Sequence, residues 1–219
     1  MRFAYLSRKT IVTGNPGLDR VIGESRSVLF FGEAGSGKTT LLLTIASNIC
    51  IDKNDPCLYI STEETLHYDR VARSPEKYAN VFFTEIYDFD ELFDFIVFKL
   101  PILKFRRVFI DSINSLYRVI ASEEESITRY GLLLGMLWKN TVDRGGFLFA
   151  SAQVRMGYED EEYEVVASGM NILDYWFKTI IYLGWEDAKR AARIVKPEEY
   201  SGESYYFLIS GEGIEWVHD

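Results

Sequence analysis

The sequence predicts an α/β fold, with a mainly parallel central sheet that is flanked by helices and extended by antiparallel strands near the C-terminus. The first observation is a set of short apolar runs without polar alternation, at residues 28–31, 58–60, 81–83, 108–110 and 147–149. Such runs are typical of parallel strands that are covered on both faces. The second observation is helical spacing of apolar residues between the runs, at 39–51, 90–103 and 126–142. Strands that alternate with helices in this way indicate crossover connections.

A change of pattern after residue 175 predicts the antiparallel extension. Strand-like runs occupy residues 178–183, 191–196 and 205–209, with expected turns at Gly184 and at Ser201-Gly202. The chain of 219 residues has room for one α/β domain and little more. We therefore expect residues 1–219 to form a single domain.

Composition and charge narrow the kind of protein. Hydrophobic residues make up 47% and charged residues 26% of the sequence, as in ordinary globular proteins. The apolar runs are too short to span a bilayer and the N-terminus lacks the apolar core of a signal peptide, so we expect a cytoplasmic protein that has no membrane partner. The net charge of -9 argues against a surface coated with basic residues for nucleic acid. Any DNA contact must therefore depend on particular side chains.

The two cysteines, Cys50 and Cys57, lie at the expected end of a helix and the expected start of the next strand. In a cytosolic protein this favours two reduced thiols. The sequence has no cluster of cysteine and histidine, so we do not expect a structural zinc site.

A phosphate-binding motif follows the first apolar run. Residues 32–39 have the sequence GEAGSGKT, which fits the pattern G-x-x-x-x-G-K-[ST]. The glycines allow backbone N–H groups to point at phosphate oxygens, and the next helix directs its positive end to the same anion. Lys38 is expected to reach the β- and γ-phosphates of ATP, and the Thr39 hydroxyl to hold Mg²⁺. The predicted nucleotide-binding residues of this segment are Gly32, Glu33, Ala34, Gly35, Ser36, Gly37, Lys38, Thr39 and Thr40.

Acidic or polar residues follow three other apolar runs. Asp111 ends one of them, where it would hold Mg²⁺ as a Walker-B aspartate does; the alternative is an N-cap of the next helix. Glu63 and Glu64 follow another run, where a carboxylate would activate the attacking water or would only complement a helix dipole. Gln153 follows the third run, and its amide would sense the γ-phosphate or that water.

Together these segments resemble the RecA-like recombinases, especially short archaeal paralogues of RadA of the RadB or RadC type, from about residue 13 to 216. The segment YISTE at 59–63 is similar to the Y-I-D-T-E of that family, and AQV at 152–154 is similar to its N-Q-V. The resemblance implies a RecA-like P-loop ATPase core in which Glu63 is the catalytic glutamate, Gln153 relays nucleotide state to DNA, and Arg70 stacks on adenine. It also implies roles in DNA recombination and repair.

Several departures from the family pattern modify this expectation. We expect neither the helical DNA-binding domain that precedes the core in full recombinases nor a clear linker of the kind that joins their subunits. We therefore expect no long filament, although a homo-oligomer fits. The Glu63-Glu64 pair is closer to the double glutamate of KaiC-like ATPases. The expected second DNA loop, between Val154 and Gly169, carries five acidic residues against Arg155.

The first DNA loop of the family would span residues 117–130 here. Arg118 matches an arginine of the family, Tyr117 would offer a face for a base to stack on, and Arg129 lies at the far end. The alternative is that Arg118 pairs with the glutamates at 123–125 on a solvated surface.

Three functions remain open at this point. The first is an accessory ATPase in recombination, with weak basal activity, weak binding of single-stranded DNA, and a RadA-type recombinase or another repair protein as partner. The second is a KaiC-like regulatory ATPase that has protein partners and no DNA role. The third is a binding module that uses ATP as a switch and hydrolyses little of it.

Overall fold

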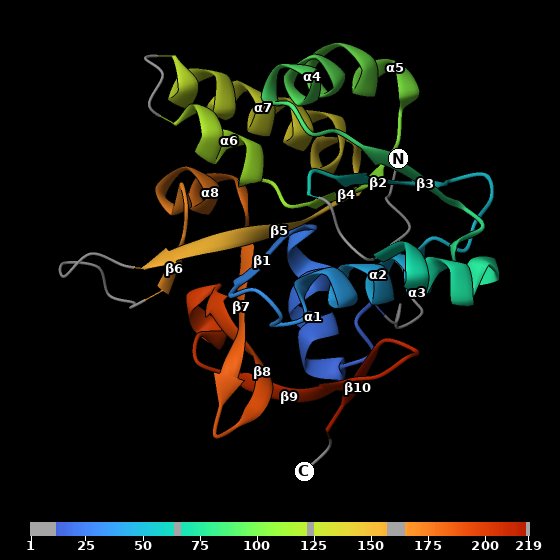
Figure 1. Cartoon of the computed structure of the whole chain (residues 1–219), viewed down its shortest axis with the longest axis vertical. Coiled ribbons are helices and arrows are strands. Elements are labelled where there is room, and N and C mark those ends of the chain that lie inside the picture. The colour runs from blue at the N-terminus through green and yellow to red at the C-terminus, as the bar shows by residue number, and fades with distance from the viewer. Residues whose placement is uncertain (1–11, 64–66, 122–124, 157–164, 218–219) are drawn as a thin grey trace.

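The computed structural model describes residues 12–63, 67–121, 125–156 and 165–217, which form one sheet with helices on both faces (Figure 1). The strand order is β10-β9-β8-β7-β1-β5-β4-β2-β3, and β6 pairs with β5. The strands are β1 (Ser27–Gly32), β2 (Cys57–Ser61), β3 (Val81–Glu85), β4 (Arg107–Asp111), β5 (Phe147–Met156), β6 (Val165–Ala167), β7 (Thr179–Glu186), β8 (Lys189–Lys196), β9 (Ser204–Ile209) and β10 (Ile214–Trp216).

Pairing is parallel from β3 through β7, and antiparallel from β7 through β10. The predicted mainly parallel sheet with an antiparallel C-terminal extension is therefore confirmed. The helices are α1 (Pro16–Ser25), α2 (Lys38–Ile49), α3 (His67–Arg73), α4 (Phe89–Asp94), α5 (Leu100–Leu103), α6 (Ser115–Ile120), α7 (Ser126–Asn140) and α8 (Met170–Trp176). None of the helices in these ranges has the length and hydrophobicity that a membrane span requires.

The pleat of the strands divides the core into two layers. Leu58 and Ile60 of β2 pack with α4, α6 and α7, whereas Tyr59 of the same strand packs with α1 and α2. Burial on both faces explains why the central strands are apolar at every position rather than at alternate ones. Figure 1 shows the two helical layers above and below the sheet.

Two details of the predicted sheet are wrong. The run at 81–83 forms β3 at the edge of the sheet, and Phe82 is 58% exposed instead of buried. Gly184 lies inside β7, and the turn to β8 is formed by Asp187 and Ala188, which both have positive φ angles. A hydrophobic run alone does not distinguish a central strand from an edge strand.

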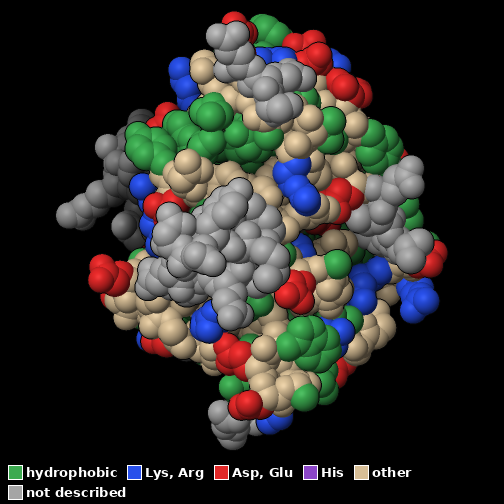
Figure 2. All heavy atoms as spheres, turned by 60° about the vertical axis from the view of Figure 1, so that its left-hand side comes forward, with side chains coloured by type: hydrophobic (Ala, Val, Ile, Leu, Met, Phe, Trp, Pro, Cys, Tyr) green, Lys and Arg blue, Asp and Glu red, His purple; other side chains and the backbone are tan. Residues whose placement is uncertain are grey.

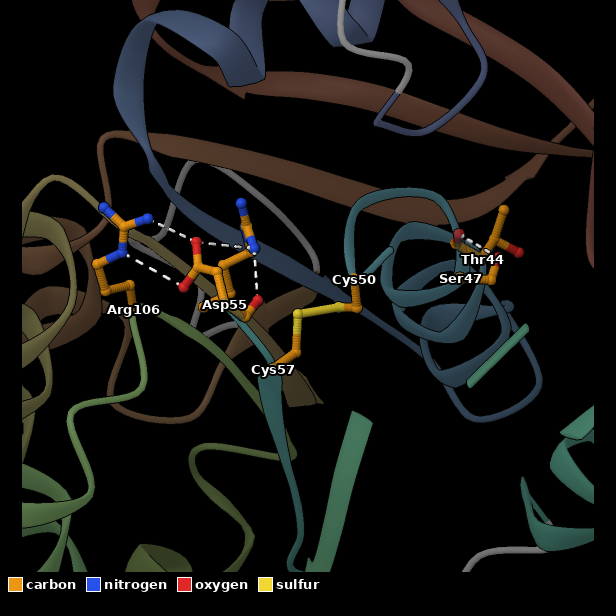
Figure 3. The surroundings of a disulfide bond; sticks show 7 residues. Thr44, Ser47, Cys50, Asp55, Cys57 and Arg106 are labelled. Atoms are coloured by element: carbon orange, nitrogen blue, oxygen red, sulfur yellow. Dashed lines mark hydrogen bonds and ion pairs between the residues drawn. A yellow bond between two sulfur atoms is a disulfide. The ribbon is translucent and has the colours of Figure 1, made fainter. Parts of the chain in front are cut away.

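The expectation of two reduced thiols is also wrong, because Cys50 and Cys57 form a disulfide. Cys50 caps the C-terminal end of α2 and Cys57 begins β2, so the turn between the two elements brings their Cα atoms to 5.7 Å. Asp55, in the same turn, forms ion pairs with Arg106 and Arg107 at the start of β4 (Figure 3). The disulfide therefore joins the C-terminal end of α2 to β2, and Asp55 joins the turn after α2 to the start of β4.

Replacing both cysteines with alanine is expected to lower the free energy of unfolding by about 2 kcal/mol, because the unfolded chain regains the freedom of a short closed loop. For a chain of this size the melting temperature should fall by about 4–8 °C. Denaturant and thermal unfolding of both proteins without reductant would measure this. Equal midpoints for the parent and the double variant would contradict a stabilising disulfide.

Candidate nucleotide-binding site

The segment between β1 and α2 has the geometry of a phosphate-binding loop. A side chain at Gly32 would place Cβ 1.9 Å from the carbonyl oxygen of Leu183, so only glycine fits at the end of β1. Gly37 has φ of 108° and is the N-cap of α2, where no side chain caps the helix. The first turn of α2 also contains no acidic residue. The helix therefore directs uncapped N–H groups and the positive end of its dipole toward the loop.

Two polar groups of this loop fit an anion. Within the described part of the chain, the buried Oγ of Ser36 has no hydrogen-bond partner, so a phosphate oxygen would satisfy it. Lys38 Nζ donates to the carbonyl oxygens of Gly32 at 2.7 Å and Glu33 at 2.8 Å. These are replaceable contacts for an ammonium group that would bind phosphate. The predicted residues of the loop therefore fit ATP.

Burial lowers the pKa of the Lys38 ammonium below its usual value, while the nearby carboxylates of Asp111, Glu63 and Glu33 oppose that shift. The carboxylates therefore favour the charged form that a phosphate needs.

A cleft of about 540 Å³ lies over the loop, and residues at the ends of several strands line it. In the sheet, Gly32 is paired with Gln153 of β5, and Ser61 with Asp111 of β4. Because parallel strands end at the same edge, the predicted side chains meet there. The lining residues are Gly32, Ala34, Gly35, Gly37, Lys38, Thr39, Thr40, Glu63, Asp111, Gln153, Val154 and Ile209.

The two acidic residues of the cleft, Asp111 and Glu63, lie at the carboxyl ends of neighbouring strands. Asp111 is 4% exposed, and the N-cap of α6 is Asn114, so Asp111 does not cap that helix. Glu63 follows β2, and its Oε1 accepts a hydrogen bond from the Ser112 hydroxyl. Oxygen ligands of this kind suit Mg²⁺, with Thr39 and Asp111 as the residues that would hold the ion. Glu64 lies outside the described residues.

Hydroxyl groups connect β2 and β4 beside these carboxylates, which the sequence analysis did not anticipate. The buried Thr62 hydroxyl donates to the carbonyl oxygen of Ser112 at 2.6 Å and accepts from its N–H at 2.9 Å. Thr62 Oγ1 also lies 2.6 Å from Ser115 Oγ. The signal in the sequence is a hydroxyl residue at the second position after each of the two apolar runs 58–60 and 108–110. It became interpretable only once the two strands were known to be neighbours.

Gln153 is fixed through its backbone and contacts Arg118 through its side chain. Asn114, fully buried, donates to the carbonyl oxygen of Gln153 at 2.8 Å and accepts from its N–H at 2.8 Å. Arg118 of α6 donates to Gln153 Oε1. The alternative was pairing of Arg118 with the glutamates at 123–125. Among the described residues no ion pair joins Arg118 to Glu125, and Glu123 and Glu124 lie outside the described ranges. Arg118 therefore links the nucleotide cleft to the surface of α6.

Arg70 lies on α3 and is not among the residues that line the cleft. Its guanidinium donates to the carbonyl oxygens of Ser210 at 3.1 Å and Gly211 at 3.3 Å, in the turn between β9 and β10. Lys77 forms an ion pair with Glu212 of the same turn at 2.6 Å. Ile209, next to this turn, lines the cleft. Stacking of Arg70 on adenine stays a prediction.

Two of the residues expected to contact DNA have partners within the protein. Tyr117 is 8% exposed and stacks on Tyr130 with ring centroids 4.1 Å apart, so the expectation of an open face for a base is wrong in this conformation. Arg129 pairs with Asp90 and lies over the rings of Phe89 and Phe93. These partners occupy the Arg129 guanidinium. Arg118 also has a partner, Gln153, but its side chain is exposed on α6, which makes it the better candidate.

The acidic residues of the expected second DNA loop, at 159–164, lie outside the described residues. Figure 2 shows the face that carries β6 and α8, where Lys and Arg side chains are interspersed with acidic ones among the described residues. The described part of this face gives no reason to expect strong binding of a phosphate backbone.

The strand order, the phosphate-binding loop and the acidic strand ends define a P-loop core of the RecA-like type. Residues 11–74 match the model of the ATPase family KaiC. The chain is 27% identical to the DNA repair and recombination protein RadB of Methanocaldococcus jannaschii, over 85% of this chain and 91% of that protein. It is also 27% identical to the RadB protein of Archaeoglobus fulgidus, over 96% of this chain and all of that protein.

A segment covering 27% of this chain and 11% of the circadian clock protein KaiC2 of Synechocystis is 40% identical to it. The chain thus resembles RadB-type RecA paralogues over most of its length, with KaiC character in its N-terminal third. The resemblance expected from the sequence is confirmed.

Proposed function

We propose that this chain is a Mg²⁺-dependent ATPase that acts in DNA repair and recombination as an accessory to a recombinase. The observation that carries the proposal is the meeting of Lys38, Thr39, Asp111, Glu63 and Gln153 at one cleft. Similarity to RadB over nearly the whole chain supports the role in recombination.

Each residue of the cleft has a distinct task in this proposal. Lys38 binds the β- and γ-phosphates, and Thr39 and Asp111 hold the ion. Glu63 orients the attacking water and accepts its proton. Mg²⁺, when bound, neutralises charge that develops on the phosphate oxygens. The Gln153 amide reports the γ-phosphate to Arg118.

The cleft is open to solvent, and cationic groups from a second subunit would be needed to stabilise the reacting phosphate. Basal turnover is therefore weak and rises on self-association or on binding of a RadA-type partner. An assay of phosphate release with and without single-stranded DNA, at two salt concentrations, tests the proposal. A chain that neither binds nor hydrolyses ATP contradicts it.

Replacing Arg118 with alanine is expected to weaken binding of single-stranded DNA to a similar degree for all sequences, because a phosphate contact carries no sequence information. Binding by the parent should be weak, with a shallow salt slope of about two or three released counterions. Fluorescence anisotropy of labelled oligonucleotides of different sequence would measure both quantities.

Arg144→Ala is the matched control for this variant. Arg144 is also exposed, but it lies just before the N-terminal end of β5, whereas the cleft lies at the carboxyl ends of the parallel strands. The same loss of DNA affinity in both variants would show a general charge effect and would argue against a contact at Arg118.

A second candidate function is a regulatory ATPase of the KaiC kind, with protein partners and no DNA role. The match of residues 11–74 to that family favours it, as do the engaged side chains of Tyr117 and Arg129. Intact ATP hydrolysis without measurable binding of single-stranded DNA would select this function over the first.

A further inference from the structure

The carboxylate of Asp111 is held on both oxygens by buried hydroxyl groups. The Tyr59 phenol donates to Oδ2 at 2.9 Å, and the Ser151 hydroxyl donates to Oδ1. Tyr59 and Ser151 are both fully buried. They belong to β2 and β5, the two strands that flank β4, so Asp111 accepts hydrogen bonds from both neighbouring strands.

The Tyr59 ring is itself fixed by aromatic neighbours. Its centroid lies 5.8 Å from that of Phe109, with nearly parallel planes, and 5.3 Å from that of Phe83. Packing of this kind is apolar, and a phenylalanine would satisfy it equally well. The Tyr59 hydroxyl is therefore not needed to fill the core, and it donates to the Asp111 carboxylate at the cleft.

We propose that Tyr59 and Ser151 are positioning residues that fix the plane of the Asp111 carboxylate for the metal ion of the ATP complex. This inference rests on the proposed function. The terminal torsion of an aspartate has broad minima, so an unrestrained carboxylate rotates freely. Two hydroxyl donors at opposite oxygens remove that freedom and leave one lone pair on each oxygen for other partners. Partners of this kind tune metal affinity at ligating carboxylates.

The test compares Tyr59→Phe and Ser151→Ala with the parent in binding of a fluorescent ATP analogue. Affinity is measured with EDTA and across a Mg²⁺ titration. Each variant should raise the Mg²⁺ concentration at the midpoint by about ten-fold or more. Affinity in EDTA should stay unchanged, because the phosphate loop does not involve either hydroxyl.

Two control variants make the same chemical changes without removing a hydrogen bond to the Asp111 carboxylate. Tyr130→Phe removes a fully buried phenol that bonds the carbonyl oxygen of Ile113, and Ser27→Ala removes a fully buried hydroxyl at the start of β1. Both controls should keep the Mg²⁺ midpoint of the parent. The inference is overturned if Tyr59→Phe has the midpoint of Tyr130→Phe, or if Tyr59→Phe loses affinity equally in EDTA and in Mg²⁺. A parent that binds no nucleotide in either condition overturns the proposed function itself.

Discussion

Replacing Glu63 with glutamine is expected to slow ATP hydrolysis by about 10²–10⁴-fold while ATP binding is retained. The amide keeps the size of the side chain but cannot accept the proton of the attacking water. Glu63 lines the cleft, and its Oε1 accepts a hydrogen bond from Ser112, so the variant should keep its place. Phosphate release under single-turnover conditions measures the chemical step, and a fluorescent ATP analogue measures binding.

The neighbouring glutamate provides the control for this experiment. Glu64→Gln removes the same charge one residue later and should hydrolyse ATP at nearly the parent rate. Normal hydrolysis by Glu63→Gln together with slow hydrolysis by Glu64→Gln would place the base at the second glutamate.

Replacing Lys38 with alanine is expected to weaken ATP binding by about 10²-fold or more, with loss of measurable hydrolysis. Charge-assisted hydrogen bonds contribute about 1.5–3 kcal/mol each, and Lys38 is expected to contact two phosphates. In the present structure its ammonium is held by the carbonyl oxygens of Gly32 and Glu33. Isothermal titration calorimetry with ATP and ADP would measure the loss, which should be larger for ATP.

Lys38→Arg is the informative companion, because it keeps the positive charge and changes its shape. Circular dichroism melts of both variants would check that the loop still folds. If Lys38→Ala binds ATP as tightly as the parent, the cleft does not use this residue for phosphate.

The parts of the site that lie within one continuous segment could be predicted from the sequence. The phosphate loop at 32–39 is such a segment, because its backbone geometry depends on its own glycines and on the strand and helix that flank it. Asp111, Glu63 and Gln153 were predictable for a related reason: each lies at or just beyond an apolar run, and parallel strands end at one edge.

Features that depend on which strands are neighbours could not be predicted. The contacts of Asp111 with Tyr59 and Ser151 require the order β5-β4-β2, which apolar runs do not specify. The stacking of Tyr117 on Tyr130 depends on how α6 and α7 pack, and the disulfide depends on how α2 turns into β2. The edge position of β3 has the same origin, since burial depends on the missing neighbour rather than on the strand's own residues.

The disulfide has a practical consequence for studying motion in this protein. Both cysteines of the chain are bonded to each other, so the native protein presents no free thiol. A cysteine introduced at an exposed position, such as Ala72 on α3, would then be the single target of a maleimide dye when reductant is omitted. Because Arg70 of the same helix contacts the turn at Ser210, a dye there would report optically whether nucleotide changes that contact.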